Sequence, residues 1–79
     1  ANSGYNEHSE MINLALQQLP AKFKSVIVLR LIEGYSTAET AEILQIPQGT
    51  VLSRLARAQK KMRHLLSPYY GVNNEKKVA

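Results

Sequence analysis

The sequence contains no cysteine, which excludes a disulfide framework, a thiolate zinc site and a cysteine nucleophile. Long apolar runs are also missing, and none approaches the ~18 residues that a membrane span needs. No basic region followed by an apolar segment, the mark of a secretory signal, opens the chain. A chain of 79 residues forms one domain with little room for an enclosed active site. These absences favour a cytoplasmic binding module that has no enzymatic activity and needs no cofactor.

Acidic side chains are missing from one stretch of the sequence, and that is where the cations gather. The formal net charge of the chain is +4. Residues 36–47 contain Glu39 and Glu42 and no base. Residues 48–66 contain no acid and five cations: Arg54, Arg57, Lys60, Lys61 and Arg63. A concentrated cationic segment indicates an anionic partner, either a nucleic acid or a membrane surface.

Apolar residues recur with the period of a helix in the N-terminal half. Ser9 is predicted to cap a first helix over residues 10–18. The chain then breaks at Leu19-Pro20, because proline disfavours helix at the preceding residue but fits the first turn of the next helix. A central helix is predicted over residues 20–33, with Gly34 as its end. Its apolar positions cover a wide arc: Phe23, Val26, Ile27, Leu29, Leu31 and Ile32.

Ser36 and Glu39 have the spacing of a capping box, in which a hydroxyl and a carboxylate cap the start of a helix. The box opens a short third helix over residues 37–45, which Pro47 prevents from continuing. The expected core contacts of this helix are Ala38, Ala41 and Leu44.

A fourth, basic helix is predicted from Gln48 to about Leu66, where Ser67-Pro68 ends it. Two short helices joined by a few residues, the second of them basic, are typical of a helix-turn-helix. The predicted fold class is therefore all-α: a four-helix right-handed helix-turn-helix, like a winged-helix DNA-binding domain without its wing. Residues 1–8 are interpreted as a flexible linker or cloning scar, residues 9–68 as the folded domain, and residues 69–79 as a flexible tail.

The fourth helix has two faces when its residues are placed about 100° apart. One stripe is apolar and is predicted to be buried: Val51, Leu55, Ala58, Met62 and Leu65. Arginine can donate two hydrogen bonds to a guanine in the major groove, lysine neutralises phosphates, and a small side chain allows close approach to the bases. The polar face and the start of the helix give these candidate DNA-binding residues: Gln48, Thr50, Ser53, Arg54, Ala56, Arg57, Lys60 and Lys61.

Other roles stay open at this point for the basic helix and for Arg54. A basic amphipathic helix can also bind a membrane surface or a protein partner of the calmodulin type. Arg54 could pair with Glu39 or Glu42 instead of binding DNA. A metal site is not expected, because His8 and His64 have no carboxylate or cysteine companions at the spacing of metal ligands.

Several short motifs together resemble a known family. They include Leu19-Pro20, Gly34-Tyr35-Ser36 and, most specific of all, the string Ile-Pro-x-Gly-Thr-Val-x-Ser-Arg-Leu-x-Arg-Ala that begins at Ile46. Residues 10–66 resemble the C-terminal promoter-recognition domain, region 4, of bacterial RNA polymerase sigma factors, and most closely the extracytoplasmic-function type. A response-regulator type of helix-turn-helix shares some of these features but normally lacks the Ser-Arg-Leu-x-Arg-Ala part.

The resemblance implies four helices, the last two of which bind the upstream (−35) promoter element. It also implies contact with the β-subunit flap of the RNA polymerase core and binding by an anti-sigma factor. Three residues depart from the family pattern. Leu52 replaces the usual lysine or arginine at a DNA-facing position, Thr40 replaces an apolar residue, and Gln45 replaces the common glycine before Ile46. The resemblance thus adds Leu52 to the candidate DNA-binding residues.

Overall fold

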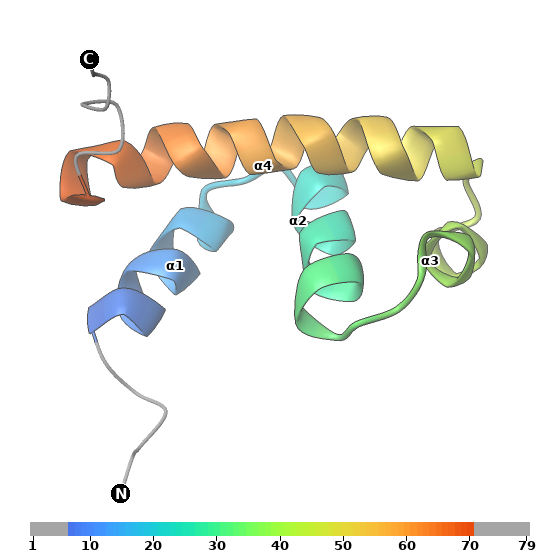
Figure 1. The fold of residues 1–79 in the computed structure, drawn as a ribbon, viewed down its shortest axis with the longest axis horizontal. Coiled ribbons are helices and arrows are strands. Elements are labelled where there is room, and N and C mark those ends of the chain that lie inside the picture. The colour runs from blue at the N-terminus through green and yellow to red at the C-terminus, as the bar shows by residue number, and fades with distance from the viewer. Residues whose placement is uncertain (1–6, 71–79) are drawn as a thin grey trace, which may run out of the picture.

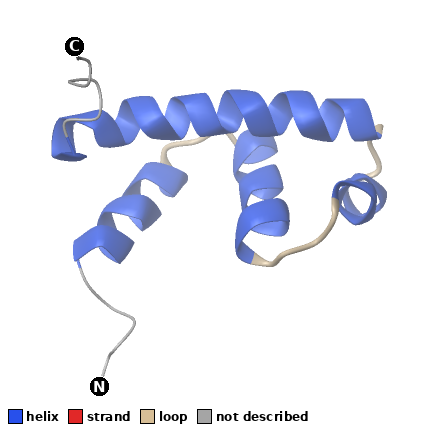
Figure 2. Cartoon of the chain, viewed as in Figure 1, coloured by secondary structure: helices blue, strands red, loops and turns tan. Residues whose placement is uncertain are grey.

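The chain folds into helices only over residues 7–70, the part that the computed structural model describes. Three short helices precede a long one: α1 (Glu7–Gln17), α2 (Ala21–Ile27), α3 (Thr37–Leu44) and then α4 (Gln48–Tyr70). A π-helical segment, η1 (Val28–Ile32), extends α2. Three short connections at residues 18–20, 33–36 and 45–47 join the helices (Figure 2). The predicted all-α helix-turn-helix fold is confirmed.

The first helix begins earlier than the sequence predicted. The α1 helix starts at Glu7, so Ser9 lies inside it, and both the cap assigned to Ser9 and the linker assigned to residues 7–8 are wrong. An acidic residue in the first turn stabilises the positive end of the helix, which helps to explain the early start at Glu7. The predictions for residues 1–6 lie outside the described residues.

The central helix changes its geometry before it ends. The backbone amide of Glu33 donates to the carbonyl oxygen of Val28 at 2.8 Å, five residues back, as in a π-helix. A π-helical turn contains more residues than an α-helical turn. Successive side chains are therefore rotated by a smaller angle about the axis of η1 than in α2. Leu31 and Ile32, predicted in the apolar arc, are exposed, so this part of the prediction is wrong, because the face that packs on the core is the one with Phe23, Val26 and Ile27. Gly34 ends the helix with a φ of 85°, as predicted.

The α3 helix has the predicted cap but a different buried face. The amide of Glu39 donates to Ser36 Oγ at 3.0 Å, and the amide of Ser36 donates to Glu39 Oε1 at 2.8 Å, which completes the capping box. Ala38 is exposed, so its predicted place in the core is wrong. Thr40 and Ala41 are buried instead, because the face that packs on the rest of the domain passes through them.

The α4 helix runs past the predicted stop and reaches Tyr70 with Pro68 inside it. In a regular helix the amide at position 68 would bond to the carbonyl oxygen of His64, and proline has no such amide. Ser67 Oγ donates to that oxygen at 3.1 Å instead. The predicted end at Leu66 is therefore wrong, and so is the predicted start of the tail at residue 69. The prediction for residues 71–79 lies outside the described part of the chain.

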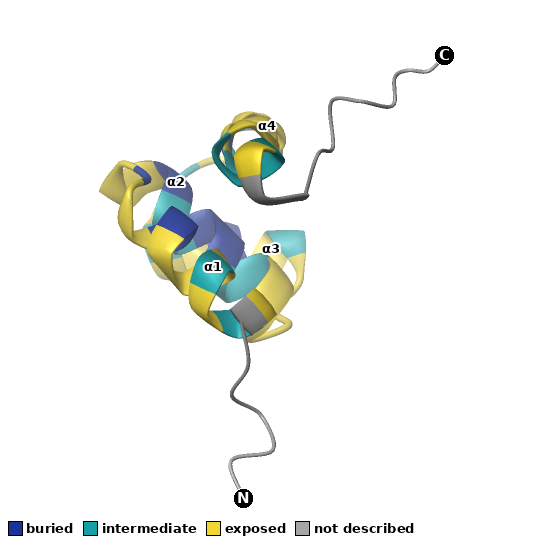
Figure 3. Ribbon diagram, turned by 90° about the vertical axis from the view of Figure 1, so that its left-hand side faces the viewer, coloured by how far each residue is buried: buried dark blue, intermediate teal, exposed yellow. Residues whose placement is uncertain are grey.

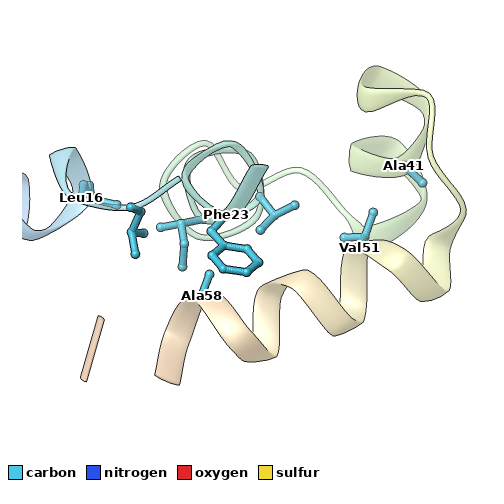
Figure 4. Packing of buried hydrophobic residues seen from close by; sticks show 8 residues of the cluster. Leu16, Phe23, Ala41, Val51 and Ala58 are labelled. Carbon is cyan, nitrogen blue, oxygen red and sulfur yellow. The ribbon is translucent and has the colours of Figure 1, made fainter. Parts of the chain in front are cut away.

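The core lies between α4 and the other helices, which all pack on one side of it (Figure 1). In Figure 4 the ring of Phe23 lies over Ala58, and Val51 lies beside Ala41 of α3. Val51 and Ala58 are fully buried, as predicted, whereas the rest of the predicted stripe is half-buried. The core cluster consists of Leu16, Leu19, Phe23, Val26, Ile27, Ala41, Val51 and Ala58. The packing of α4 therefore leaves its other side open along the helix.

Candidate nucleic-acid interface

The open side of α4 is the largest continuous feature of the site. The helix has 23 residues, which corresponds to a length of about 35 Å. Figure 3 shows its exposed side turned away from α1, α2 and α3. An α-helix fits the major groove of DNA, which is ~12 Å wide.

Most of the candidate DNA-binding residues are exposed on α4, and three of them, Arg57, Lys60 and Lys61, also line a groove beside Leu19 and Phe23. The structure leaves seven of the nine exposed: Gln48, Leu52, Ser53, Ala56, Arg57, Lys60 and Lys61. The remaining two, Thr50 and Arg54, are half-buried. The nine residues thus come from one helix, and their exposure differs with the direction in which they project from it.

Arg54 has no carboxylate partner in the described part of the chain, so it makes no ion pair with Glu39 or Glu42. The alternative role predicted for Arg54, a salt bridge to α3, is therefore not observed. An unpaired guanidinium at the edge of the open side keeps its donors available for an anionic ligand.

Ser53 is exposed, and its hydrogen-bonding state favours one role. Its Oγ donates to the carbonyl oxygen of Thr50 at 3.2 Å. With its proton engaged, the hydroxyl presents its lone pairs outward as acceptors. Adenine N6 and cytosine N4 carry the amino groups that donate in the major groove. In this rotamer Ser53 is suited to accept a hydrogen bond from either base.

The turn before α4 fixes the angle between α3 and α4. Gln45 adopts a left-handed conformation with φ 59° and ψ 47°, which reverses the chain after α3. The amide of Ile46 donates to the carbonyl oxygen of Ala41 at 3.0 Å. On the far side of the turn, the amides of Thr50 and Val51 donate to the carbonyl oxygen of Pro47 at 3.0 and 3.2 Å. These bonds tie Ile46 to the end of α3 and Pro47 to the first turn of α4, while Val51 packs beside Ala41 of α3.

Gly49 is a feature that the sequence reasoning did not single out. It lies exposed in the first turn of α4, and a Cβ built on it would meet nothing within 4 Å. A glycine costs stability inside a helix, and no close contact within the domain requires one here. The absence of a side chain allows an external group, such as a phosphate, to approach the backbone at the positive end of the helix. The sequence signal that could have pointed to this feature is a glycine at the start of a basic helix.

The cationic surface continues toward the C-terminal end of α4. Arg63 and His64 are exposed there, in addition to the predicted Lys60 and Lys61. A groove separates this half of α4 from the junction of α1 and α2, and its apolar lining includes Leu19, Phe23 and Leu65. The exposed cations of α4 therefore extend from Arg57 to Arg63.

Two kinds of feature are absent from the described residues. They contain no group of three or more histidine, cysteine, aspartate or glutamate side chains that could hold a metal ion. Within residues 7–70, no helix combines the length and the apolar character that a bilayer crossing requires.

Residues 9–62 match the protein family described as "Sigma-70, region 4". The chain is 42% identical over 60 residues to the ECF RNA polymerase sigma factor SigW of Bacillus subtilis, which is 76% of this chain and 32% of that protein. It is 40% identical over 55 residues to SigM of Mycobacterium tuberculosis, covering 70% of this chain and 28% of that protein. It is 35% identical over 63 residues to the RNA polymerase sigma-H factor of Pseudomonas aeruginosa, covering 80% of this chain and 33% of that protein. The chain thus spans about a third of the length of these relatives.

Proposed function

Because this chain belongs to the sigma-70 region 4 family, we propose that it binds the upstream (−35) element of promoter DNA in a sigma factor that directs RNA polymerase in transcription initiation. The observation that carries the proposal is the open side of α4, where cations and small polar residues lie opposite the buried Val51 and Ala58. The domain acts by binding and has no enzymatic activity of its own.

In the proposed complex α4 enters the major groove with its N-terminal turns against the bases. Arg57 reads a guanine through two hydrogen bonds, and Ser53 accepts one from an amino group on a neighbouring base. Lys60 and Lys61 neutralise phosphates. The first turn, from Gln48 to Thr50, presents the positive end of the helix to a phosphate. The α3 helix crosses the backbone, as the first helix of a helix-turn-helix does.

We propose that the partners of the domain are the β-subunit flap of the bacterial RNA polymerase core and an anti-sigma factor, both in the cytoplasm. Large apolar side chains are exposed on elements other than α4, and they supply apolar surface that a protein partner would cover. Ile12 and Leu14 are exposed on α1, Leu31 and Ile32 on η1, and Tyr35 in the loop that follows η1. These side chains lie outside the open side of α4, so the same domain can bind DNA and protein.

The test of the proposed function is selection of duplexes from a randomised library by the 79-residue chain, followed by dimethyl sulfate footprinting. The reagent methylates guanine N7 in the major groove, so bound α4 should protect guanines there. We expect an enriched motif and protected guanines within it. Enrichment without a motif, or protection in the minor groove only, would contradict the proposal. Co-purification of the chain with bacterial RNA polymerase core then tests the partner.

A further inference from the structure

Leu52 is an exposed leucine on the side of α4 that faces away from the core. Its side chain is 55% exposed, and among the described residues of α4 it is the only large apolar side chain left so open. It does not join the half-buried apolar residues that pack against the core. Nothing within the described domain therefore accounts for a leucine at this position.

The neighbours of Leu52 along the helix are also uncharged. Gln48 lies four residues before it and Ala56 four residues after it, and both are exposed. Side chains four residues apart differ by about 40° around the helix, so the three form one stripe, here called the uncharged stripe. Ser53 and Arg57 lie on the other flank of the open side. The uncharged flank and the polar, cationic flank thus lie on either side of the helix, about 140° apart between Leu52 and Arg57.

Each residue of the uncharged stripe has chemistry that fits an A·T pair. A glutamine side chain can hydrogen-bond to N6 and N7 of adenine, and an apolar side chain can contact the C5-methyl group of thymine. Leucine cannot donate to a guanine or neutralise a phosphate, so any contribution of Leu52 to DNA binding must come from apolar contact.

We propose that Leu52 is a specificity-determining residue that recognises the methyl group of a thymine, next to a base pair read by Gln48. This inference rests on the proposed function, because it needs α4 in the major groove. At one edge of its site the chain should then prefer A·T pairs that turn their thymine methyl groups toward Leu52. A cation at this position would bind a guanine or a phosphate instead.

The test uses uracil, which pairs like thymine but lacks the methyl group. The 79-residue chain first selects duplexes from a randomised library made with thymine. Each thymine of the selected duplex is then replaced singly by uracil, and the affinity is measured by fluorescence anisotropy at fixed salt. Leu52→Ala is compared with Leu14→Ala, a matched control that removes a leucine 50% exposed on α1. Circular dichroism confirms that both variants fold.

For the parent chain and for Leu14→Ala, uracil at one or two positions should weaken binding about fourfold, the factor that corresponds to one buried methyl group. For Leu52→Ala, uracil at the position that Leu52 contacts should weaken binding clearly less, because alanine covers less of the methyl group than leucine does. Leu52→Lys should lose the thymine preference and bind all duplexes more tightly.

The outcomes separate this inference from the function on which it rests. If the parent chain selects a motif but uracil has no effect, or has the same effect in Leu52→Ala, the role of Leu52 is overturned while DNA binding stands. In that case the exposed leucine would be a candidate for a protein contact. If the parent chain selects no motif at all, the proposed function itself fails.

Discussion

The side-chain amide of Gln45 donates a hydrogen bond to the carbonyl oxygen of Glu42 at 2.9 Å, while the Gln45 backbone takes a left-handed conformation. This geometry explains why glycine suits the position: a left-handed φ costs a residue with a Cβ more than it costs glycine. The side-chain hydrogen bond offsets part of that cost by giving the Glu42 carbonyl oxygen a second donor besides the Gln45 amide, which lies at 3.3 Å.

Replacing Gln45 by glycine should stabilise the domain. The change removes the strain of φ 59° but also removes the exposed hydrogen bond. We expect the free energy of unfolding to rise by about 0.5–1 kcal/mol. Urea denaturation followed by circular dichroism measures it. Gln45→Ala is the control, because it keeps the strain, loses the bond and should be less stable than the parent. A destabilised Gln45→Gly would show that the side-chain bond outweighs the strain.

Thr40 offers a second test of stability. Its side chain is fully buried, and Oγ1 has no hydrogen-bond partner. Thr40→Val replaces the hydroxyl by a methyl group of similar size, so the free energy of unfolding should rise by about 1 kcal/mol. Thr40→Ser keeps the hydroxyl and removes the methyl group, so it should be less stable than the parent. Equal stability of Thr40→Val and the parent would mean that the hydroxyl has found a partner in solution.

The helices, their order and the buried Val51 could be predicted from the sequence because each depends on local signals. The capping box at Ser36 and Glu39 and the glycine at position 34 are examples. The misplaced features depend on how elements pack or on single hydrogen bonds. The apolar arc drawn over residues 20–33 was too wide, because only the face with Phe23, Val26 and Ile27 packs on the core while Ile32 is exposed. A rule about proline did not anticipate that α4 continues past Pro68, where Ser67 Oγ bonds to the carbonyl oxygen of His64.

The candidate site was easier to predict than its details. A basic, amphipathic helix places Ser53, Arg57 and Lys60 opposite the core by period alone, and the structure leaves all three exposed. Exposure does not show which of them touch DNA, so their roles remain predictions. The hydrogen bond from Ser53 to Thr50 and the empty space around Gly49 depend on coordinates and could not be derived from the periodicity.

Salt dependence tests the phosphate contacts of α4. The logarithm of the affinity for duplex DNA should fall linearly with the logarithm of salt concentration, with a slope of about −0.9 for each phosphate neutralised. Lys61→Ala should flatten that slope by about one and weaken binding to all sequences alike. Lys22→Ala removes the same charge from α2 and should leave the slope unchanged. An affinity independent of salt would rule out this binding mode.

Base reading is tested apart from charge by the ratio of affinities for a selected and a scrambled duplex. Arg57 is exposed on the flank opposite the uncharged stripe, where it can donate two hydrogen bonds to a guanine. Losing such a pair should cost about 1–3 kcal/mol on the selected duplex and little on the scrambled one.

Arg57→Ala should therefore lower the ratio at fixed salt and relax the preference at one base pair. Lys60→Ala is the matched control, since it removes a cation from the same helix and should weaken binding to both duplexes equally. An unchanged ratio for Arg57→Ala would reduce Arg57 to a phosphate contact and leave Ser53 as the leading base reader. The two variants separate these cases because a phosphate carries no sequence information, whereas the edge of a guanine does.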